Sequence, residues 1–277
     1  MILTTITPVW GRAEQLRIWL RAVRGATIRT RIRHFVYFVG EDRPLNEDAS
    51  FVYFHESGPP QSIGHYHNLG ANQAQTPWIM KLDVDTLPNV EYFEALLPIL
   101  EQAGEREWFN GGMFYVNEHF SKLLLTENRM PLSMDDYRRV ILHPKGHTGS
   151  KYDLPQATNF ICRREAYLGH AMSDDRFKGY GWEDYQQIYD LEFYQQGKDP
   201  LPGLLGASNV TQRCREEIAR RKALELYQKD ERLALLHRWH PVGPAQDGYR
   251  SGRQMTLNRQ VLLDCIQRRR AFSNDRL

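Results

Sequence analysis

The chain has 277 residues, with 36 lysines and arginines against 34 acidic residues, and 41% of its residues are hydrophobic. This balance is typical of an ordinary soluble protein, long enough to bury one large α/β core or two small ones. Three widely spaced cysteines, no apolar stretch of membrane-spanning length and no signal-peptide pattern argue against secreted and membrane proteins, so we predict a cytoplasmic protein.

Short apolar segments alternate with amphipathic segments through the first hundred residues. We expect strands over residues 2–7, 34–39, 51–55 and 78–82, and helices over residues 16–23, 63–74 and 90–102. Strands that alternate with helices indicate a mostly parallel sheet with helices on both faces. The sequence therefore predicts a Rossmann-like α/β fold.

The pattern changes in the second part of the chain. A strand over residues 108–116 is followed by a long irregular stretch, which is typical of a lid, an acceptor-binding loop or a poorly ordered segment. Beyond it we expect a strand over 158–163, a helix over 183–196 that ends at Gly197, a hinge at 200–203 and a charged helix over 215–236.

Two aspartates, Asp83 and Asp85, follow the apolar run that begins at Trp78. Residues i and i+2 of a strand point to the same side, so both carboxylates can converge on one hard divalent cation. In α/β sheets, ligands collect beyond the carboxyl ends of strands, where this pair falls. The alternative is a strand that ends in a turn with two solvated or capping aspartates.

A second motif leads into the helix predicted from residue 183. Tyr180 and Trp182 offer flat faces on which a sugar can stack. Glu183 and Asp184 begin the helix, where free N–H groups favour ionised carboxylates. An ionised Asp184 can accept a proton from an incoming hydroxyl group. The alternative is a pair of first-turn helix acids beside a packing tryptophan.

Two histidines, His237 and His240, lie late in the sequence, where a turn can bring them together. A neutral imidazole beside two carboxylates makes a mixed nitrogen and oxygen shell that suits Mn²⁺ and is tolerable for Mg²⁺. The sequence does not separate the two histidines. The alternative for either is a satisfied surface or core residue.

In this order of motifs (strand, Asp-x-Asp, aromatic-Gly-Glu-Asp, late His) the chain resembles the metal-dependent glycosyltransferases of the GT-A fold. It is similar to the family 2 bacterial enzymes and to the galactosyltransferase-type group that carries a Gly-Trp-Gly-x-Glu-Asp motif. The resemblance implies a GT-A domain over residues 1–242, with a nucleotide-binding half over 1–105 and an acceptor-binding half over 106–242. Residues 243–277 would form a helical basic tail.

The resemblance also implies roles for single residues. Asp83 and Asp85 match the metal and diphosphate motif, which His237 or His240 would complete. Asp184 matches the catalytic base of inverting members.

Further positions follow from the same resemblance. Glu183 would orient acceptor or donor hydroxyl groups, and Tyr180 and Trp182 would bind the acceptor, although the family usually has Trp-Gly-Gly at positions 180–182. His67 stands where the family has an arginine. The positions that match nucleotide-binding residues, besides the two aspartates, are Thr7, Pro8, Arg12, Glu41, Asp42 and Asn68.

The implied reaction is an inverting transfer of a sugar from a nucleoside-diphosphate sugar, first of all a UDP-sugar, to a hydroxyl group of a glycan or lipid-linked glycan. Mn²⁺ or Mg²⁺ would be the cofactor, and nucleic acid would not be a partner. Bacterial surface polysaccharide synthesis is the process that the resemblance implies. A metal-dependent nucleotidyltransferase and a carbohydrate-binding protein without catalysis are the alternatives.

Residues 213–277 hold 15 lysines and arginines against 8 acidic residues. Arg268, Arg269 and Arg270 lie beside the apolar Ile266 and Phe272, so the tail can rest on the inner face of an anionic membrane or on an acidic polymer. The alternative is a solvated helix face.

Overall fold

A computed structural model describes residues 1–27, 31–39, 49–56, 61–142, 159–179, 181–240 and 252–274. In this part of the chain a six-stranded sheet has the order β3-β2-β1-β4-β8-β6, and a three-stranded sheet has the order β5-β9-β7. The strands are β1 Leu3–Trp10, β2 Ile32–Val39, β3 Phe51–Glu56, β4 Trp78–Lys81, β5 Thr86–Leu87, β6 Trp108–Gly111, β7 Met113–Tyr115, β8 Asn159–Arg163 and β9 Leu235–His237.

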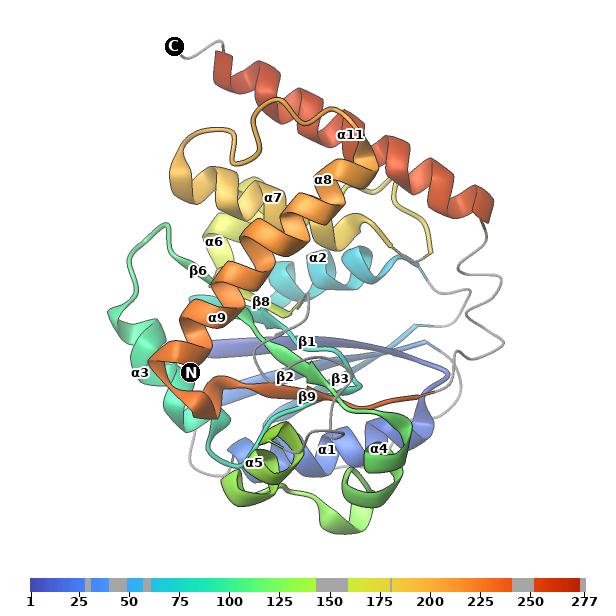
Figure 1. Cartoon of the computed structure of the whole chain (residues 1–277), viewed down its shortest axis with the longest axis vertical. Coiled ribbons are helices and arrows are strands. Elements are labelled where there is room, and N and C mark those ends of the chain that lie inside the picture. Colours follow the sequence, from blue (N-terminus) through green and yellow to red (C-terminus); the bar gives the residue numbers. More distant parts are fainter. Residues whose placement is uncertain are drawn as a thin grey trace.

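Helices lie on both faces of the larger sheet. Figure 1 shows α1 and α5 on one side of it and α2, α7 and α11 on the other. The α-helices are α1 Ala13–Thr27, α2 Ile63–Gln73, α3 Tyr92–Gln102, α4 Glu118–Leu124, α5 Met134–Leu142, α6 Arg164–Ala166, α7 Glu183–Gln196, α8 Ala207–Arg213, α9 Arg220–Lys229 and α11 Gly252–Asn274. Short 3-10 or π segments are η1 Glu127–Arg129, η2 Tyr167–Ala171, η3 Cys214–Ala219 and η4 Glu231–Leu233.

The predicted mixed α/β fold with a mostly parallel sheet is confirmed. Strand β1 pairs in parallel with β2 and β4, and β2 pairs in parallel with β3. Strand β8 runs antiparallel between β4 and β6. Helix α1 lies between β1 and β2 in the chain and α2 lies between β3 and β4, and the parallel pairing of β1 with β4 brings their carboxyl ends to the same edge of the sheet.

The side chains of β2 divide between two cores because strand residues alternate between faces. Val36 and Phe38 pack in one cluster with residues of α1 and α3. Phe35 and Tyr37 pack in the other cluster with residues of α2, α7 and α11. Both faces of the sheet are thus covered, which explains the nearly continuous apolar sequence of the strand.

The prediction of one strand over residues 108–116 is wrong. The segment forms β6 in the larger sheet and β7 in the smaller one. Gly111 and Gly112 lie where the chain passes from one sheet to the other, and a Cβ atom at Gly111 would lie 3.0 Å from Leu235 Cδ1. Glycine therefore permits the close approach that the change of sheet requires.

The stretch predicted as irregular after Val116 is helical in α4, η1 and α5. The side chain of Asn117 caps α4 by accepting a hydrogen bond from the backbone N–H of Phe120 at 2.9 Å. Such short helices lack the long periodic pattern that sequence analysis detects. Residues 143–158, which the prediction included, lie outside the described residues.

The prediction of one helix over residues 215–236 is also wrong at both ends. Helical structure begins at Ala207 and ends at Lys229. Asp230 is extended and its side chain accepts a hydrogen bond from the backbone N–H of Arg232 at 3.0 Å, which caps the next turn. Residues 235–237 then pair as β9 between β5 and β7, so the tertiary contacts of this segment override its helical pattern.

The described part of the basic tail, residues 252–274, is the helix α11, which packs on the rest of the described chain. Leu262 and Ile266 of α11 are 0% and 2% exposed and belong to the same core cluster as residues of α7. The three consecutive arginines are paired within the chain: Arg268 with Asp174 at 2.6 Å, Arg269 with Asp190 at 2.9 Å and Arg270 with Asp199 at 2.7 Å.

These ion pairs engage three arginines that were predicted to form a basic surface. Contact of the tail with a membrane stays a prediction. The domain boundaries at residues 105 and 242 stay predictions as well. No helix within the described ranges is both long and apolar enough to cross a bilayer.

Candidate active site

The predicted Asp-x-Asp motif lies in a turn at the carboxyl end of β4. Strand β4 ends at Lys81, and the backbone N–H of Thr86 donates to the carbonyl of Asp83 at 2.9 Å. The prediction that a strand presents Asp83 and Asp85 on one face is therefore wrong. The turn directs the carboxylate of Asp85 toward His237 and that of Asp83 toward Lys81.

Asp85, His237 and His240 form one group. The register of β5 against β9 pairs Thr86 with His237, which places this histidine beside Asp85. Asp85 Oδ2 lies 3.0 Å from His240 Nε2, and Asp85 Oδ1 lies 3.6 Å from His237 Nε2. One ligand atom from each residue lies within 4.8 Å of the other two. Both histidines that the sequence could not separate thus reach the same carboxylate.

Arg12 joins this group from the carboxyl end of β1. Gly11, with φ of +60°, turns the chain after the strand, and Arg12 Nη1 then contacts Asp85 Oδ2 and lies 3.1 Å from His240 Nε2. Burial by itself would raise the pKa of Asp85. The nearby His237, His240 and Arg12 outweigh burial and hold that pKa well below its usual range.

The donor set of this group fits a divalent cation. Two imidazole nitrogens and a carboxylate are ligands that Mn²⁺ accepts readily, whereas Mg²⁺ prefers oxygen. Burial lowers the pKa of His237, so its ring is neutral and able to bind metal. Arg12 contacts the same carboxylate, so its guanidinium competes with a cation for Asp85. Asp83 lies outside the group of three.

Asp85→Asn is expected to weaken Mn²⁺ binding by about 100-fold or more, because it removes the anionic ligand of the group. Isothermal titration of Mn²⁺ into the purified protein measures the effect. Asp83→Asn serves as the comparison and is expected to change the affinity less, since Asp83 lies outside the group. Equal Mn²⁺ affinity of Asp85→Asn and the wild type would contradict the assignment.

A second group forms around Lys81, which is 2% exposed. Its Nζ donates to Asp184 Oδ1 at 2.5 Å and lies 3.7 Å from Asp83 Oδ1. Burial alone would lower the pKa of Lys81, but the two carboxylates raise it, so the ammonium stays charged. Burial raises the pKa of Asp83 to about 6, against the opposing effect of Lys81. The predicted base and one predicted metal ligand thus share one buried cation.

Sequence reasoning missed Lys81, although a signal was present. A lysine stands inside the apolar run over residues 78–82, in a strand expected to be buried. A lysine is almost never fully buried unless acidic groups pair with it. The Asp-x-Asp motif that follows directly was the visible source of such groups.

Glu183 begins α7 and is 0% exposed. Burial and the charge of Asp184 raise the pKa of Glu183 to about 8, so its carboxyl group is protonated at neutral pH. The predicted contact of Glu183 with acceptor or donor hydroxyl groups requires an access that this buried position does not provide. His67, at the position of the family arginine, is also buried, and burial lowers its pKa.

The pH dependence of stability tests the buried state of Glu183. Its raised pKa means that the folded chain keeps the proton up to about pH 8, whereas the unfolded chain releases it near pH 4.5. The contribution of Glu183 to the free energy of unfolding is therefore fully present below the pKa of the unfolded chain, and it is lost as the pH rises through the pKa of the folded chain. We expect the free energy of unfolding of the wild type, relative to Glu183→Gln, to fall from about pH 5 to about pH 9 in urea titrations.

The control for this experiment is Glu94→Gln, which changes an exposed acid in the first turn of α3. The free energy of unfolding of Glu94→Gln should differ from that of the wild type by a nearly constant amount at every pH. If the free energies of unfolding of the wild type and Glu183→Gln also differ by a constant amount, Glu183 is not protonated in the folded chain.

Of the residues predicted to bind nucleotide, Thr7 and Asn68 make hydrogen bonds inside the chain, whereas Arg12 reaches the candidate site. Thr7 is fully buried and donates to the carbonyl of Leu82 at 2.7 Å, so it fixes the turn that carries the aspartates. The side-chain amide of Asn68 donates to the carbonyl of Ser173, and its oxygen accepts from the Tyr167 hydroxyl and from the backbone N–H of Ser173. Its contact with nucleotide stays a prediction. Arg12 does reach the site.

Five further residues were predicted to bind the nucleotide or the acceptor. Pro8 lies in β1 and is partly exposed. Glu41, Asp42 and Tyr180 lie outside the described residues. The ring of Trp182, predicted to bind the acceptor, has the guanidinium carbon of Arg259 5.5 Å from its centroid, so one face of the ring is occupied by α11.

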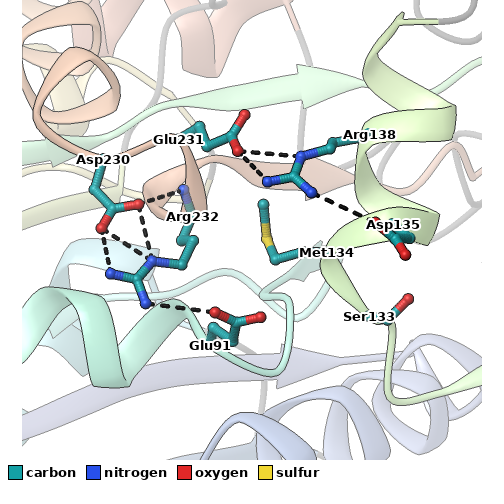
Figure 2. Close-up of a pocket in the computed structure, with 8 residues that line it drawn as sticks. All are labelled: Glu91, Ser133, Met134, Asp135, Arg138, Asp230, Glu231 and Arg232. Atoms are coloured by element: carbon teal, nitrogen blue, oxygen red, sulfur yellow. Dashed lines mark hydrogen bonds and ion pairs between the residues drawn. The ribbon is translucent and has the colours of Figure 1, made fainter.

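A pocket with a volume of about 460 Å³ lies elsewhere, between α3, α5 and η4 (Figure 2). Its charged groups pair with one another: Arg138 with Glu231 and Asp135, and Arg232 with Asp230 and Glu91 (Figure 2). None of its lining residues belongs to the candidate active site. The paired charges identify it as an ion-pair network at the surface.

No protein-family model and no curated protein matches this sequence. Among solved structures, the chain is similar to S. aureus TarS 1–349, with 13% identity and a TM-score of 0.40 over 70% of this chain and 55% of that one. It is also similar to glucosyl-3-phosphoglycerate synthase from Mycobacterium tuberculosis in complex with Mn²⁺, UDP and phosphoglyceric acid, with 11% identity and a TM-score of 0.45 over 97% of this chain and 78% of that one. The chain spans about half of the TarS fragment. Values this low carry no argument about function.

Proposed function

We propose that this chain is a metal-dependent, inverting glycosyltransferase with a GT-A-type domain. The observation that carries the proposal is the meeting of two groups at one edge of the parallel sheet. Asp85 lies there with two histidines, and Asp184 lies there with Lys81. Sugar transfer from a diphosphate donor requires a cation that stabilises the leaving diphosphate and a carboxylate that takes the proton of the acceptor hydroxyl.

The donor half of the proposal concerns the diphosphate leaving group. Asp85, His237 and His240 would hold Mn²⁺ or Mg²⁺, which would neutralise the charge that grows on the diphosphate as it departs. Arg12, beside Asp85, would present a guanidinium whose geometry matches phosphate oxygens. These residues thus bind the donor and favour the departure of its nucleotide.

The acceptor half concerns Asp184. The carboxylate of Asp184 accepts a hydrogen bond from the buried Lys81 ammonium at 2.5 Å, which orients this side chain. Asp184 takes the proton of the acceptor hydroxyl, whose oxygen attacks the anomeric carbon from the face opposite the diphosphate and inverts it.

We propose a UDP-linked hexose as the donor and a hydroxyl group of a glycan or lipid-linked glycan as the acceptor. The resemblance of the motifs to those of family 2 bacterial enzymes supports this choice. It also supports a role in bacterial surface polysaccharide synthesis.

The test is incubation of the protein with UDP-linked and GDP-linked sugars, with and without Mn²⁺, followed by assay of the released phosphates. Release of a nucleoside diphosphate that depends on Mn²⁺ and is lost in Asp85→Asn supports the proposal. Release of pyrophosphate would identify a nucleotidyltransferase instead. Protection of the fold against heat by glycan alone, with no release from any donor, would indicate a carbohydrate-binding protein.

A further inference from the structure

The C-terminal helix α11 contacts the segment that carries the proposed base. Asn258 of α11 is 0% exposed, and its side chain bonds to the backbone of Lys178 and Gly181. Its Nδ2 donates to the carbonyl of Lys178 at 2.9 Å and to the carbonyl of Gly181 at 3.1 Å, and its Oδ1 accepts from the N–H of Lys178 at 3.2 Å. Gln254 Nε2 donates to the same Oδ1 at 3.0 Å. The amide of Asn258 thus has its donor and acceptor capacity in use.

The backbone next to Asn258 adopts a conformation that L-amino acids rarely take. Gly179, Gly181 and Trp182 all have positive φ, at 64°, 99° and 79°. Glycine adopts such angles freely, but for Trp182 the left-handed conformation costs free energy and persists only where the surroundings impose it. Asp184 follows two residues later, so the direction of its side chain depends on this conformation.

Two more residues of α11 contact the same segment. A Cβ atom at Gly181 would lie 3.0 Å from the sulfur of Met255, so the helix packs directly on the glycine backbone. Arg259 lies against the ring of Trp182. Because Leu262 anchors α11 in the core cluster that also contains residues of α7, the helix and the motif are fixed to one body.

We propose that Asn258 is a positioning residue for Asp184, and that α11 is therefore part of the catalytic unit. By bonding to Lys178 and Gly181, Asn258 holds the motif in the conformation that directs Asp184 to Lys81. This inference rests on the proposed function for its catalytic consequence, whereas the contact itself is testable without any activity.

The first measurement is hydrogen–deuterium exchange of the full-length chain. In Asn258→Ala, amides of residues 181–187 are expected to exchange about tenfold faster than in the wild type, while those of β1 keep their rate. Gln260→Ala is the matched control, since Gln260 is an exposed amide residue of the same helix that bonds to Asp264. It should exchange like the wild type.

The second measurement is the transfer reaction. Asn258→Ala is expected to lower kcat by about tenfold or more while the KM for the donor changes less than about twofold, because the donor-binding residues lie on other elements. A general loss of stability would instead accelerate exchange in β1 as well. If Asn258→Ala does not fold, Arg259→Ala replaces it, with an increase in exchange of about threefold expected over residues 181–187.

Unchanged exchange over residues 181–187 in the folded variant would overturn the inference, as would a wild-type kcat. A wild type that releases no nucleoside diphosphate from any donor would refute the proposed function. The exchange result would still decide whether Asn258 holds the motif.

Discussion

Asp184→Asn is expected to reduce sugar transfer by about 100-fold to 10,000-fold while the affinity for the donor changes by less than about threefold. The amide keeps the size of the side chain but cannot accept the proton of the acceptor hydroxyl. In the proposed function the donor is held by Arg12 and by a cation at Asp85, and the substitution changes neither residue. Initial rates of nucleotide release in the presence of acceptor, and titration of UDP with Mn²⁺, measure the two quantities separately.

Asp175→Asn provides the control for this prediction, because Asp175 is an exposed acid in the loop before the motif. It should retain nearly full activity. An Asp184→Asn variant that kept most of its turnover would refute the assignment of Asp184 as the base. A variant that lost donor binding together with turnover would place Asp184 in the donor site instead.

Lys81→Met is expected to lower the free energy of unfolding by about 3 kcal/mol or more, because it leaves partly buried carboxylates without their common cation. The side chains of Asp184 and Asp83 are only 14% and 26% exposed, so water solvates their charges poorly. Methionine fills a similar volume, which limits the cost of lost packing. Urea unfolding at neutral pH measures the change.

The matched control is Lys122→Met, which removes an exposed lysine whose pair with Glu118 lies on the surface of α4. A pair of this kind contributes about 0.5 kcal/mol or less. The double variant Lys81→Met with Asp184→Asn should recover part of the lost stability, since it also removes an unpaired charge. A Lys81→Met protein as stable as the control would argue against a charged, buried Lys81.

Much of the fold was readable in the sequence because local patterns determine it. The apolar runs at residues 34–39 and 51–55 form β2 and β3, and the helix predicted over 183–196 is α7, ended by Gly197 with φ of 69°. The small sheet was not readable in this way. Strands β5, β7 and β9 have two or three residues each, which is too short for a periodic pattern.

For the candidate site, too, some features could be predicted from the sequence and others depended on tertiary structure. The sequence by itself determined which chemical groups are available, namely the acids after β4, the acids that begin α7 and the late histidines. It could not determine their pairing, because the pairing of β9 with β5 and the docking of α11 join residues more than 70 positions apart. Tertiary structure alone decided that Asp85 joins both histidines while Asp184 joins Lys81. The physical reason is that a buried charge requires a partner, and only the packed chain brings that partner within reach.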